Sequence, residues 1–525
     1  MAGFSRLFVD YVEGSGTARE FYARGFDQAE LLDFAKETAL ASRVDRALIT
    51  DILVDQQALW GVDAAAVANA RRLSDPSATV IVTGQQVGLF TGPLYTVLKA
   101  LTTVLLAREL EAASGTPVIP VFWLGSEDHD FDEMATASVP GVSFTVPRPE
   151  ASNTGPVGAL KFGAEIADLV DQLQESLPPT DFRDEVMDAV RSCYKPGATF
   201  RDAFAGLLRG LLPETGLVLF AQDDPRVKRL AAPLWRREIE DSASSDAALR
   251  SATDRVSKDY HAQVHIRPSN LFLIHEAQRL PLDVEDDRFV LRGTEHSWSR
   301  EELSALLDSS PEMFSPNVVL RPLTQDWLFP TVAYVGGPGE TAYFAQYKGV
   351  YKWAGLPMPA IYPRISATLI EPGIRRSLSK IGAPTAAFGQ DRDALFSTLA
   401  KERMEFDVES RFGRTIGGIN NLISPLVPEV VAIDASLKKS IEATRAALQN
   451  EIMRLRDRVL KADRRNRDNL RQQVDKVADG LFPGGKPQER VISPLYFTTK
   501  YGPDFFLRLM EDLDADSRSH LLIDL

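Results

Sequence analysis

The chain has 525 residues, 44% of them hydrophobic and 25% charged, a length and composition suited to two or three globular domains. Its formal net charge of −14 argues against a general binder of nucleic acid or of anionic membrane surfaces. A single cysteine, Cys193, excludes an intramolecular disulfide, and neither a signal peptide nor a run of membrane-span length is evident. We therefore expect a cytoplasmic protein without nucleic-acid or membrane partners.

The first part of the chain predicts a β-α-β unit. Residues 1–78 read as mostly helical, and the β-branched run 79–83 is typical of a buried strand. Residues 94–113 have the apolar spacing of a helix, and 118–124 form a second apolar strand. A crossover of this kind is almost always right-handed and makes the two strands parallel. The polar segments that follow them therefore meet at the carboxyl edge of the sheet, where open α/β sheets bind ligands.

The rest of the core is predicted to be interrupted twice. Residues 138–212 begin with Pro- and Gly-rich turns and continue as helices, whereas 271–317 begin with strand-like alternation. These two insertions divide a Rossmann-like parallel core into the segments 1–137, 213–270 and 318–389, and residues 483–525 are apolar enough to return to it. The further short apolar runs predicted as core strands are 216–220, 318–320, 331–335 and 359–362.

Residues 390–482 predict an α-helical coiled coil or helical hairpin. The stretches 395–412 and 433–478 are long, charged and almost free of Gly and Pro. A helix packed on its own domain is the alternative, but a second copy of the same helix is the simplest partner and gives a homodimer. The apolar positions with heptad spacing are Ile441, Leu448, Ile452, Leu455, Val459 and Ala462.

The polar turn after the first predicted strand, TGQQVG, is a candidate nucleotide site. It is neither a dinucleotide fingerprint nor a P-loop, because Gly-x-Gly-x-x-Gly and Gly-Lys-Ser/Thr are absent. Glycines and free backbone N–H groups before a helix nevertheless suit phosphate groups. A glycine turn with surface amides is the alternative. The candidate nucleotide-binding residues are Thr83, Gly84, Gln85, Gln86 and Gly88.

The segment EDHDFDE, residues 127–133, follows the second predicted strand and places five carboxylates and one imidazole together. Such a cluster repels itself unless proton sharing, a magnesium ion or a cationic substrate compensates it. One imidazole among carboxylates suits a general base for an amine nucleophile. The alternative is an acidic surface loop in which Asp130 or Asp132 caps a helix. The candidate catalytic residues are Asp128, His129 and Asp130.

A third group of candidate residues lies in the segments RPLTQD and AYVGGPGETAY. The fork of Arg321 or of Arg364 can hold a carboxylate or phosphate, and the Gly336-Gly337 pair brings backbone close to a ligand. A structural tight turn with a Glu at the start of a helix is the alternative. The candidate substrate-binding residues are Arg321, Gln325, Asp326, Tyr334, Gly336, Gly337, Glu340, Tyr343 and Arg364.

Zinc is not expected. His261 and His265 are four residues apart and could share one helix face, but no third ligand is near in the sequence. The chain has only one cysteine and six histidines, which argues against a zinc site. We predict no resident metal site.

Four segments together, VTGQQVGLFTGPLYT, PVFWLGSEDHDFDE, RPLTQD and AYVGGPGETAYFAQ, resemble the cysteine-adding enzymes of bacillithiol biosynthesis, the BshC family. The resemblance extends over essentially the whole chain. It implies a Rossmann-like core related to class I aminoacyl-tRNA synthetases, connecting-peptide insertions and a dimerising coiled coil. It also implies the joining of L-cysteine to the glucosamine amine of glucosaminyl malate, for which we expect ATP with Mg²⁺.

Two class I signatures differ in this chain. The His-x-Gly-His position is occupied by Thr83-Gly84-Gln85-Gln86, and the Lys-Met-Ser-Lys-Ser loop has only a faint counterpart at 376–380. Besides the ligase, the sequence therefore leaves open a non-catalytic nucleotide-binding scaffold and a nucleotidyltransferase acting on another acid.

Overall fold

The computed structural model describes residues 4–61, 63–148, 155–264, 266–403 and 407–525. The chain divides into two compact units. The first comprises Met1–Thr368 and Gln488–Leu522, and the second comprises Leu369–Pro487 and Ile523–Leu525. The second unit begins before residue 390, where the sequence placed the boundary, because helix α16 packs with the long helix α20.

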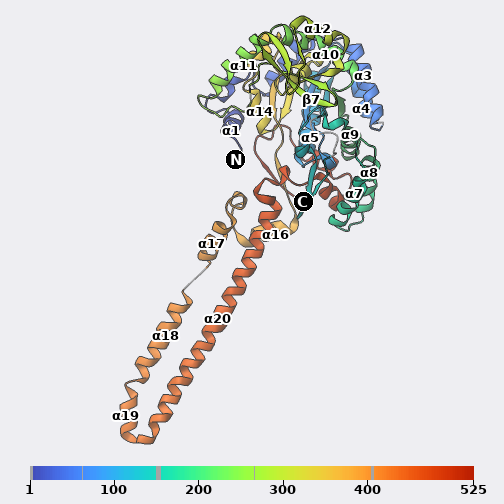
Figure 1. Cartoon of the computed structure of the whole chain (residues 1–525). Coiled ribbons are helices and arrows are strands. Elements are labelled where there is room, and N and C mark those ends of the chain that lie inside the picture. The colour runs from blue at the N-terminus through green and yellow to red at the C-terminus, as the bar shows by residue number, and fades with distance from the viewer. Residues whose placement is uncertain (1–3, 62, 149–154, 265, 404–406) are drawn as a thin grey trace. The chain divides into compact units, whose positions relative to one another are not determined.

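A five-stranded parallel sheet forms the centre of the first unit, with the strand order β12-β11-β1-β2-β5 (Figure 1). The chain proceeds from β1 to β2 and β5 on one side, whereas β11 and β12 lie on the other side of β1. The strand order therefore reverses between β1 and β11, which is where open sheets of this type bind ligands. The strands are β1 Thr79–Gln86, β2 Val118–Gly125, β5 Val218–Ala221, β11 Thr331–Gly336 and β12 Ala360–Pro363.

Strand β1 is longer than predicted. It continues through the segment expected to be a turn, with Gly84 paired to Trp123 and Gln86 to Gly125 on β2. A Cβ at Gly84 would lie 3.0 Å from the carbonyl oxygen of Trp123, so this glycine permits close packing of two strands. The turn comes later, where Phe90 has a φ of 50°, and helix α5 begins only at Tyr95.

Helices surround the sheet, and α5 packs against β1 and β2 as the predicted crossover requires (Figure 1). The helices of the first unit are α1 Arg6–Glu13, α2 Gln28–Ala39, α3 Arg46–Leu59, α4 Ala64–Arg72, α5 Tyr95–Ser114, α6 Phe131–Met134, α7 Glu165–Ser176, α8 Arg183–Cys193, α9 Phe200–Leu211, α10 Pro225–Glu240, α11 Ser242–Val256, α12 Arg300–Ser309, α13 Leu320–Leu328, α14 Pro338–Phe344, α15 Lys348–Ala354, α21 Pro494–Tyr501 and α22 Phe505–Glu511.

Both predicted insertions carry structure of their own. The first contains an antiparallel hairpin followed by α7 to α9. The second forms an antiparallel sheet with the order β10-β6-β7-β8-β9. Residues 318–320 are not a strand, because Asn317 Oδ1 accepts the N–H groups of Val319 and Leu320 and so starts α13. The remaining strands are β3 Thr136–Val139, β4 Val142–Thr145, β6 Leu271–His275, β7 Gln278–Glu285, β8 Arg288–Leu291, β9 Ser297–Trp298, β10 Phe314–Pro316, β13 Ala367–Ile370 and β14 Leu521–Asp524.

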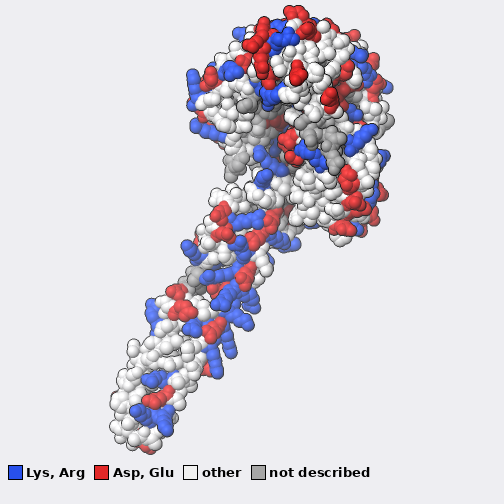
Figure 2. Space-filling view, in the orientation of Figure 1, with Lys and Arg blue, Asp and Glu red and all other residues white. Residues whose placement is uncertain are grey.

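The second unit is helical, and α18 runs alongside α20 as a hairpin (Figure 1). Arg456 on α20 pairs with Glu409 on α18 at 3.7 Å. Lys and Arg side chains gather along this hairpin (Figure 2), and several pair within α20, including Arg471 with Asp475 at 3.1 Å. The helices are α16 Pro372–Ile381, α17 Arg392–Glu402, α18 Val408–Ile423, α19 Leu426–Ile433 and α20 Lys438–Leu481.

One segment, Val408–Ile433, is long and apolar enough by length and composition to cross a membrane, contrary to the expectation that no run approaches a membrane span. It comprises α18 and α19 and is interrupted at Ser424 and Pro425. A polar contact joins α18 to α20, since Gln449 Nε2 donates to Asn420 Oδ1 at 2.6 Å. A single segment of this kind is weak evidence for a membrane protein, and the contact with α20 favours helix–helix packing.

A buried carboxyl group on α10 makes the stability of the first unit depend on pH. Glu238 is 0% exposed, and its Oε1 accepts from Asn270 N at 2.9 Å and from Asn270 Nδ2 at 3.0 Å. Burial raises the pKa of Glu238 from 4.5 to about 7. The folded state therefore favours the protonated form, and its stability falls as the pH rises from about 4.5 to about 7.

We expect Glu238→Gln to remove this loss, because the amide is never charged. At pH 8 the variant should unfold at a higher urea concentration than the wild type, with a gain on the order of 3 kcal/mol. At pH 4 the difference should largely vanish. Urea titrations followed by circular dichroism measure both, and exposed Glu240→Gln is the control. An equal effect of Glu238→Gln at both pH values would contradict a buried, titrating Glu238.

Candidate active site

The candidate site lies at the carboxyl ends of β1, β2 and β11, where the strand order reverses. Thr83 Oγ1 on β1 donates to Val335 O on β11 at 2.8 Å and links the two strands directly. The backbone of Thr83 to Gln86 takes part in the β ladder, so this segment is a strand and not the turn from which a phosphate cradle was expected. Nucleotide binding by this segment stays a prediction. It now depends on the side chains of Thr83, Gln85 and Gln86 and no longer on a backbone turn.

The two glutamines of β1 have different hydrogen-bond partners. Gln85 Nε2 donates to the hydroxyl of Tyr95 at 3.1 Å. Gln86 Nε2 donates to Asp128 Oδ2 at 2.7 Å and to Glu133 Oε2 at 2.9 Å. Successive side chains of a strand point to opposite faces, so Gln85 faces α5 and Gln86 faces the acidic segment after β2.

Glu127, the first member of the acidic segment, is structural. Its side chain is 1% exposed and forms an ion pair with Lys228 of α10. The second oxygen, Oε2, accepts from Ser315 Oγ at 2.8 Å. A buried carboxylate requires this compensation. The charge of Glu127 is therefore neutralised inside the protein and does not face the site.

The remaining carboxylates are compensated separately. Asp128 Oδ1 accepts the N–H of His129 at 2.7 Å, while Asp132 pairs with Arg148 at 3.0 Å. Asp130 Oδ1 accepts the N–H of Glu133 at 3.2 Å and caps α6, which confirms the capping alternative for that residue. Catalytic roles for Asp128 and Asp130 stay predictions, and Asp128 is the one joined to β1 through Gln86.

His129 contacts an arginine that the sequence did not single out. Its Nδ1 lies 2.9 Å from Arg279 Nη1 and 3.6 Å from Asp128 Oδ1. Burial and the charge of Arg279 lower the pKa of His129, outweighing the opposite effect of Asp128 and Asp130. Arg279 belongs to β7 of the second insertion, whose alternating pattern gave no sign that it reaches the core sheet.

Lys99 was also missed. It lies on α5, is 3% exposed, and its Nζ donates to Gly84 O at 2.9 Å and Gln85 Oε1 at 3.0 Å. It pairs with Glu340 Oε2 at 2.5 Å, and Glu340 also accepts from Tyr334 OH at 2.6 Å. A lone charge inside the apolar run YTVLKALTTVLL was the available signal, because buried lysines require partners.

Arg364 is already paired within the protein. Its Nη1 and Nη2 donate to Glu489 Oε2 and Oε1 at 2.9 and 2.6 Å, and its side chain is 3% exposed. Glu489 comes from the C-terminal segment that was predicted to return to the core. Gly337 lies beside this pair, since a Cβ there would be 3.5 Å from Arg364 Nε. The predicted binding of a substrate carboxylate by Arg364 would require sharing the guanidinium with Glu489.

The RPLTQD residues lie on α13 and face the interior. Arg321 Nη1 donates to Gln325 Oε1 at 3.2 Å, and the guanidinium lies 5.3 Å from the ring centre of Tyr334. Gln325 Nε2 donates to Asp326 Oδ1 at 2.8 Å, and burial raises the pKa of Asp326 to about 6. Gln325 is 0% exposed. These residues pack in the interior beneath the candidate site, and Tyr343 is half-buried.

Comparisons with known proteins identify the family. The model of the bacillithiol biosynthesis BshC N-terminal Rossmann-like domain matches residues 1–365, and that of the BshC C-terminal coiled-coil domain matches residues 367–525. The chain belongs to the BshC family. These matches confirm the predicted fold, a Rossmann-like α/β domain with a parallel sheet followed by a coiled-coil domain, and they confirm the resemblance noted in the sequence.

Several BshC proteins are similar over their full length. One from Salinibacter ruber, named "Putative cysteine ligase BshC", is 44% identical and the match covers 100% of this chain and 97% of that protein. The same name is given to relatives from Chlorobaculum tepidum, 36% identical with coverage of 100% and 97%, and from Koribacter versatilis, 35% identical with coverage of 97% and 95%.

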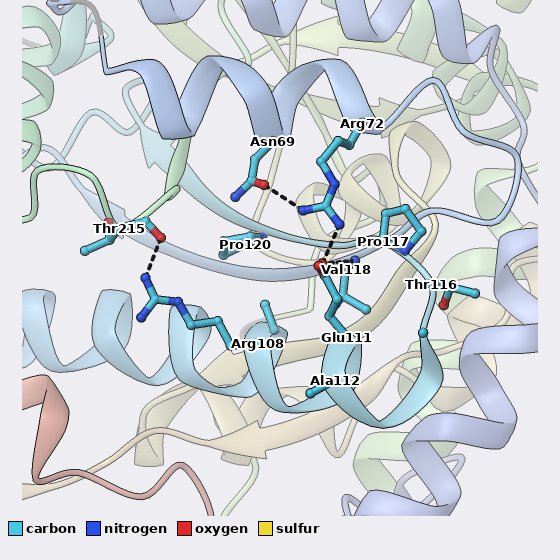
Figure 3. Close-up of a pocket in the computed structure, with 12 residues that line it drawn as sticks. Asn69, Arg72, Arg108, Glu111, Ala112, Thr116, Pro117, Val118, Pro120 and Thr215 are labelled. Carbon is cyan, nitrogen blue, oxygen red and sulfur yellow. Dashed lines mark hydrogen bonds and ion pairs between the residues drawn. The ribbon is translucent and has the colours of Figure 1, made fainter.

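A separate cavity of about 570 Å³ lies near the amino end of β2, between α4 and α5 (Figure 3). Arg72 on one wall pairs with Glu111 on the other at 2.7 Å. Arg108 Nη2 donates to Thr215 O at 3.2 Å. No residue predicted for the BshC site lines this cavity, which lies at the edge of the sheet opposite the candidate active site.

Within the described residues, no group of three or more His, Cys, Asp and Glu side chains is arranged to hold a metal ion. His261 follows the end of α11 and is not in a helix. His265 lies outside the described residues, so the possibility of a His261–His265 pair is not tested.

Proposed function

We propose that this BshC protein is a cytoplasmic, ATP-dependent ligase that joins L-cysteine to the glucosamine amine of glucosaminyl malate. The observation that carries the proposal is the 44% identity over the full chain to a protein named as a cysteine ligase. The polar cluster at the reversal point of the sheet supports it, because that edge is where related folds bind substrates.

The reaction explains why ATP is included. A carboxylate is a poor electrophile, and ATP would supply phosphate or AMP as a leaving group on the carboxyl carbon of cysteine. The candidate donors for its phosphates are Lys99 Nζ and the amides of Gln85 and Gln86, which suit phosphate oxygens chemically. Each would have to exchange an acceptor within the protein for a phosphate oxygen. Mg²⁺ would accompany the nucleotide, since it is commonly held by substrate phosphates with few protein ligands.

Product formation tests the proposal. The purified protein is incubated with cysteine, glucosaminyl malate and Mg-ATP, and the amide is detected by mass spectrometry, with each component omitted in turn. We expect an ATP-dependent product, and the by-product, ADP or AMP, identifies the leaving group. A folded protein that forms no amide under any of these conditions would contradict the ligase.

A non-catalytic scaffold is the second candidate. It is favoured by the absence of the class I signatures and by the pairing of Lys99 with Glu340 and of Arg364 with Glu489. Calorimetric titration separates the candidates. The ligase requires binding of ATP and of the sugar conjugate, whereas a scaffold with a vestigial site predicts no heat of binding from either.

We also propose that the protein is a homodimer through the hairpin of the second unit. Leu448 and Leu455 of the predicted heptad seam remain 44% and 50% exposed in the single chain, and Leu422 of α18 is 74% exposed. Since α18 leaves much of this apolar surface uncovered, a second hairpin is the simplest partner, through a two-fold contact.

Leu455→Asp is expected to yield a monomer with the first unit still folded, because the seam would contain an unpaired charge. Light scattering at micromolar concentration measures the mass, and circular dichroism measures the fold. Lys461→Asp, at an exposed position of the same helix, is the matched control and should remain dimeric. If the unmodified protein is already monomeric, the proposed homodimer is wrong.

A further inference from the structure

The contact between His129 and Arg279 determines where the imidazole carries its proton. Arg279 Nη1 lies 2.9 Å from His129 Nδ1. A guanidinium has N–H donors and no acceptor, and it stays charged throughout the physiological range. Nδ1 must therefore accept this hydrogen bond. A neutral imidazole that accepts at Nδ1 carries its single proton on Nε2.

Arg279 is fixed by contacts on every side. Its Nε donates to Ser315 Oγ at 2.9 Å and its Nη2 to Pro316 O at 2.7 Å. The guanidinium lies 4.0 Å from the ring centre of Phe272, and the residue is 7% exposed. These hydrogen-bond acceptors are neutral, and the charges of Glu127 and Asp128 favour the charged form of the guanidinium beside His129. The arginine has little freedom to turn away.

The same network extends to the core sheet. Ser315 Oγ donates to Glu127 Oε2 at 2.8 Å, and the other oxygen of Glu127 is held by Lys228. Glu127 follows β2, Ser315 is on β10 and Lys228 is on α10. These contacts therefore hold Arg279 at a fixed place relative to the end of β2 and to the loop that contains His129.

This arrangement leaves His129 no free lone pair. Nδ1 accepts from Arg279 and Nε2 carries the proton, so taking a second proton would place two N–H donors against each other. Burial, and after it the charge of Arg279, lowers the pKa of His129, which agrees with this arrangement. The side chain is 40% exposed, and within the described residues its hydrogen bond is made through Nδ1, so Nε2–H can be offered to a ligand.

We infer that His129 acts as a neutral hydrogen-bond donor through Nε2–H, with Arg279 as its positioning residue, and not as a general base. This deepens the proposed ligase and rests on it. When the amine attacks the activated carboxyl carbon, a C–N bond forms and the carbonyl electron pair moves to oxygen. An N–H donor stabilises this oxyanion. The pair then re-forms the carbonyl and expels phosphate or AMP, while the amine proton passes to water.

The tautomer can be measured without any substrate. The protein is labelled with ¹⁵N-histidine, and long-range ¹⁵N–¹H spectra distinguish a protonated Nδ1 from a protonated Nε2. The chain has six histidines, and His129→Gln assigns the signal by its disappearance. We expect an unprotonated Nδ1 and a protonated Nε2 from pH 6 to 8. A protonated Nδ1, or an imidazolium at pH 7, overturns the inference even if the protein proves to be a ligase.

Arg279→Met provides the second readout. Without the donor, His129 should populate both tautomers, whereas Arg292→Met, in the turn directly after β8, should leave the His129 spectrum unchanged. Arg292 is the matched control because its partner is Asp283, at an N–O distance of 2.7 Å, and not His129. An unchanged His129 spectrum in folded Arg279→Met would contradict the role of Arg279. If that variant does not fold, the wild-type spectrum still decides the tautomer.

Activity separates donor from base in a way that stability cannot. His129→Gln keeps an N–H near the position of Nε2 but cannot take up a proton, whereas His129→Ala has neither property. We expect His129→Gln to turn over at least about tenfold faster than His129→Ala, because one such donor contributes roughly 10²–10³-fold. Equal losses of turnover in both variants would favour His129 as a general base and overturn its role as a hydrogen-bond donor.

Discussion

His129→Ala is expected to lower turnover by roughly 10²–10³-fold, because the variant loses the Nε2–H that we propose to stabilise the developing oxyanion. The ring is 40% exposed and its centre lies 5.8 Å from that of Phe272. We expect the variant to fold, with a loss of stability from the missing contact with Arg279. Turnover is measured at saturating cysteine, glucosaminyl malate and ATP, with circular dichroism as the check on folding.

His296→Ala, at an exposed position of the second insertion, is the matched control and should retain wild-type turnover. Near-normal turnover of His129→Ala would remove His129 from the catalytic residues, whichever tautomer it adopts. A loss in both variants would indicate that the assay reports on folding.

Arg364→Met is expected to destabilise the first unit by about 3–5 kcal/mol, because it leaves the carboxylate of Glu489 buried without its cation. Glu489 is 0% exposed, and its oxygens also accept from Ser366 Oγ at 3.0 Å and Ala367 N at 3.0 Å. The C-terminal segment that carries Glu489 should loosen with it. Urea denaturation measures the change, and Arg364→Met combined with Glu489→Gln should recover part of the loss.

Arg292→Met is the control for this prediction, because its ion pair with Asp283 involves an arginine side chain that is 50% exposed. An exposed pair of this kind contributes about 0–1 kcal/mol. A loss below 1 kcal/mol in Arg364→Met would mean that Glu489 is not the principal partner of Arg364. The guanidinium would then be available for the substrate carboxylate that the sequence suggested.

Local patterns were sufficient to predict the centre of the fold. The runs 79–83 and 118–124 with the helix between them became β1, β2 and α5, because fully buried strands and crossover helices have distinct apolar patterns. The rule that parallel strands end at one edge then placed Gln86 near Asp128, and the structure joins these two side chains at 2.7 Å.

Contacts between distant segments could not be predicted in this way. Glu489 meets Arg364 across 125 positions, and Arg279 meets His129 across 150, and no periodicity describes such pairs. The glycine at position 84 was misread because a tight turn and a close approach of two strands both require a residue without a side chain. Lys99 alone left a local signal, a single charge within an apolar helix.

We propose that amide formation takes place at the carboxyl ends of β1, β2 and β11. The most direct measurement compares amide formation by the wild type, Gln86→Leu and Arg108→Gln under single-turnover conditions. Gln86 joins β1 to Asp128 and Glu133, whereas Arg108 lines the cavity at the opposite edge. We expect at least about a tenfold loss for Gln86→Leu, since misplacing catalytic groups is costly, and wild-type rates for Arg108→Gln. The reverse pattern would contradict it.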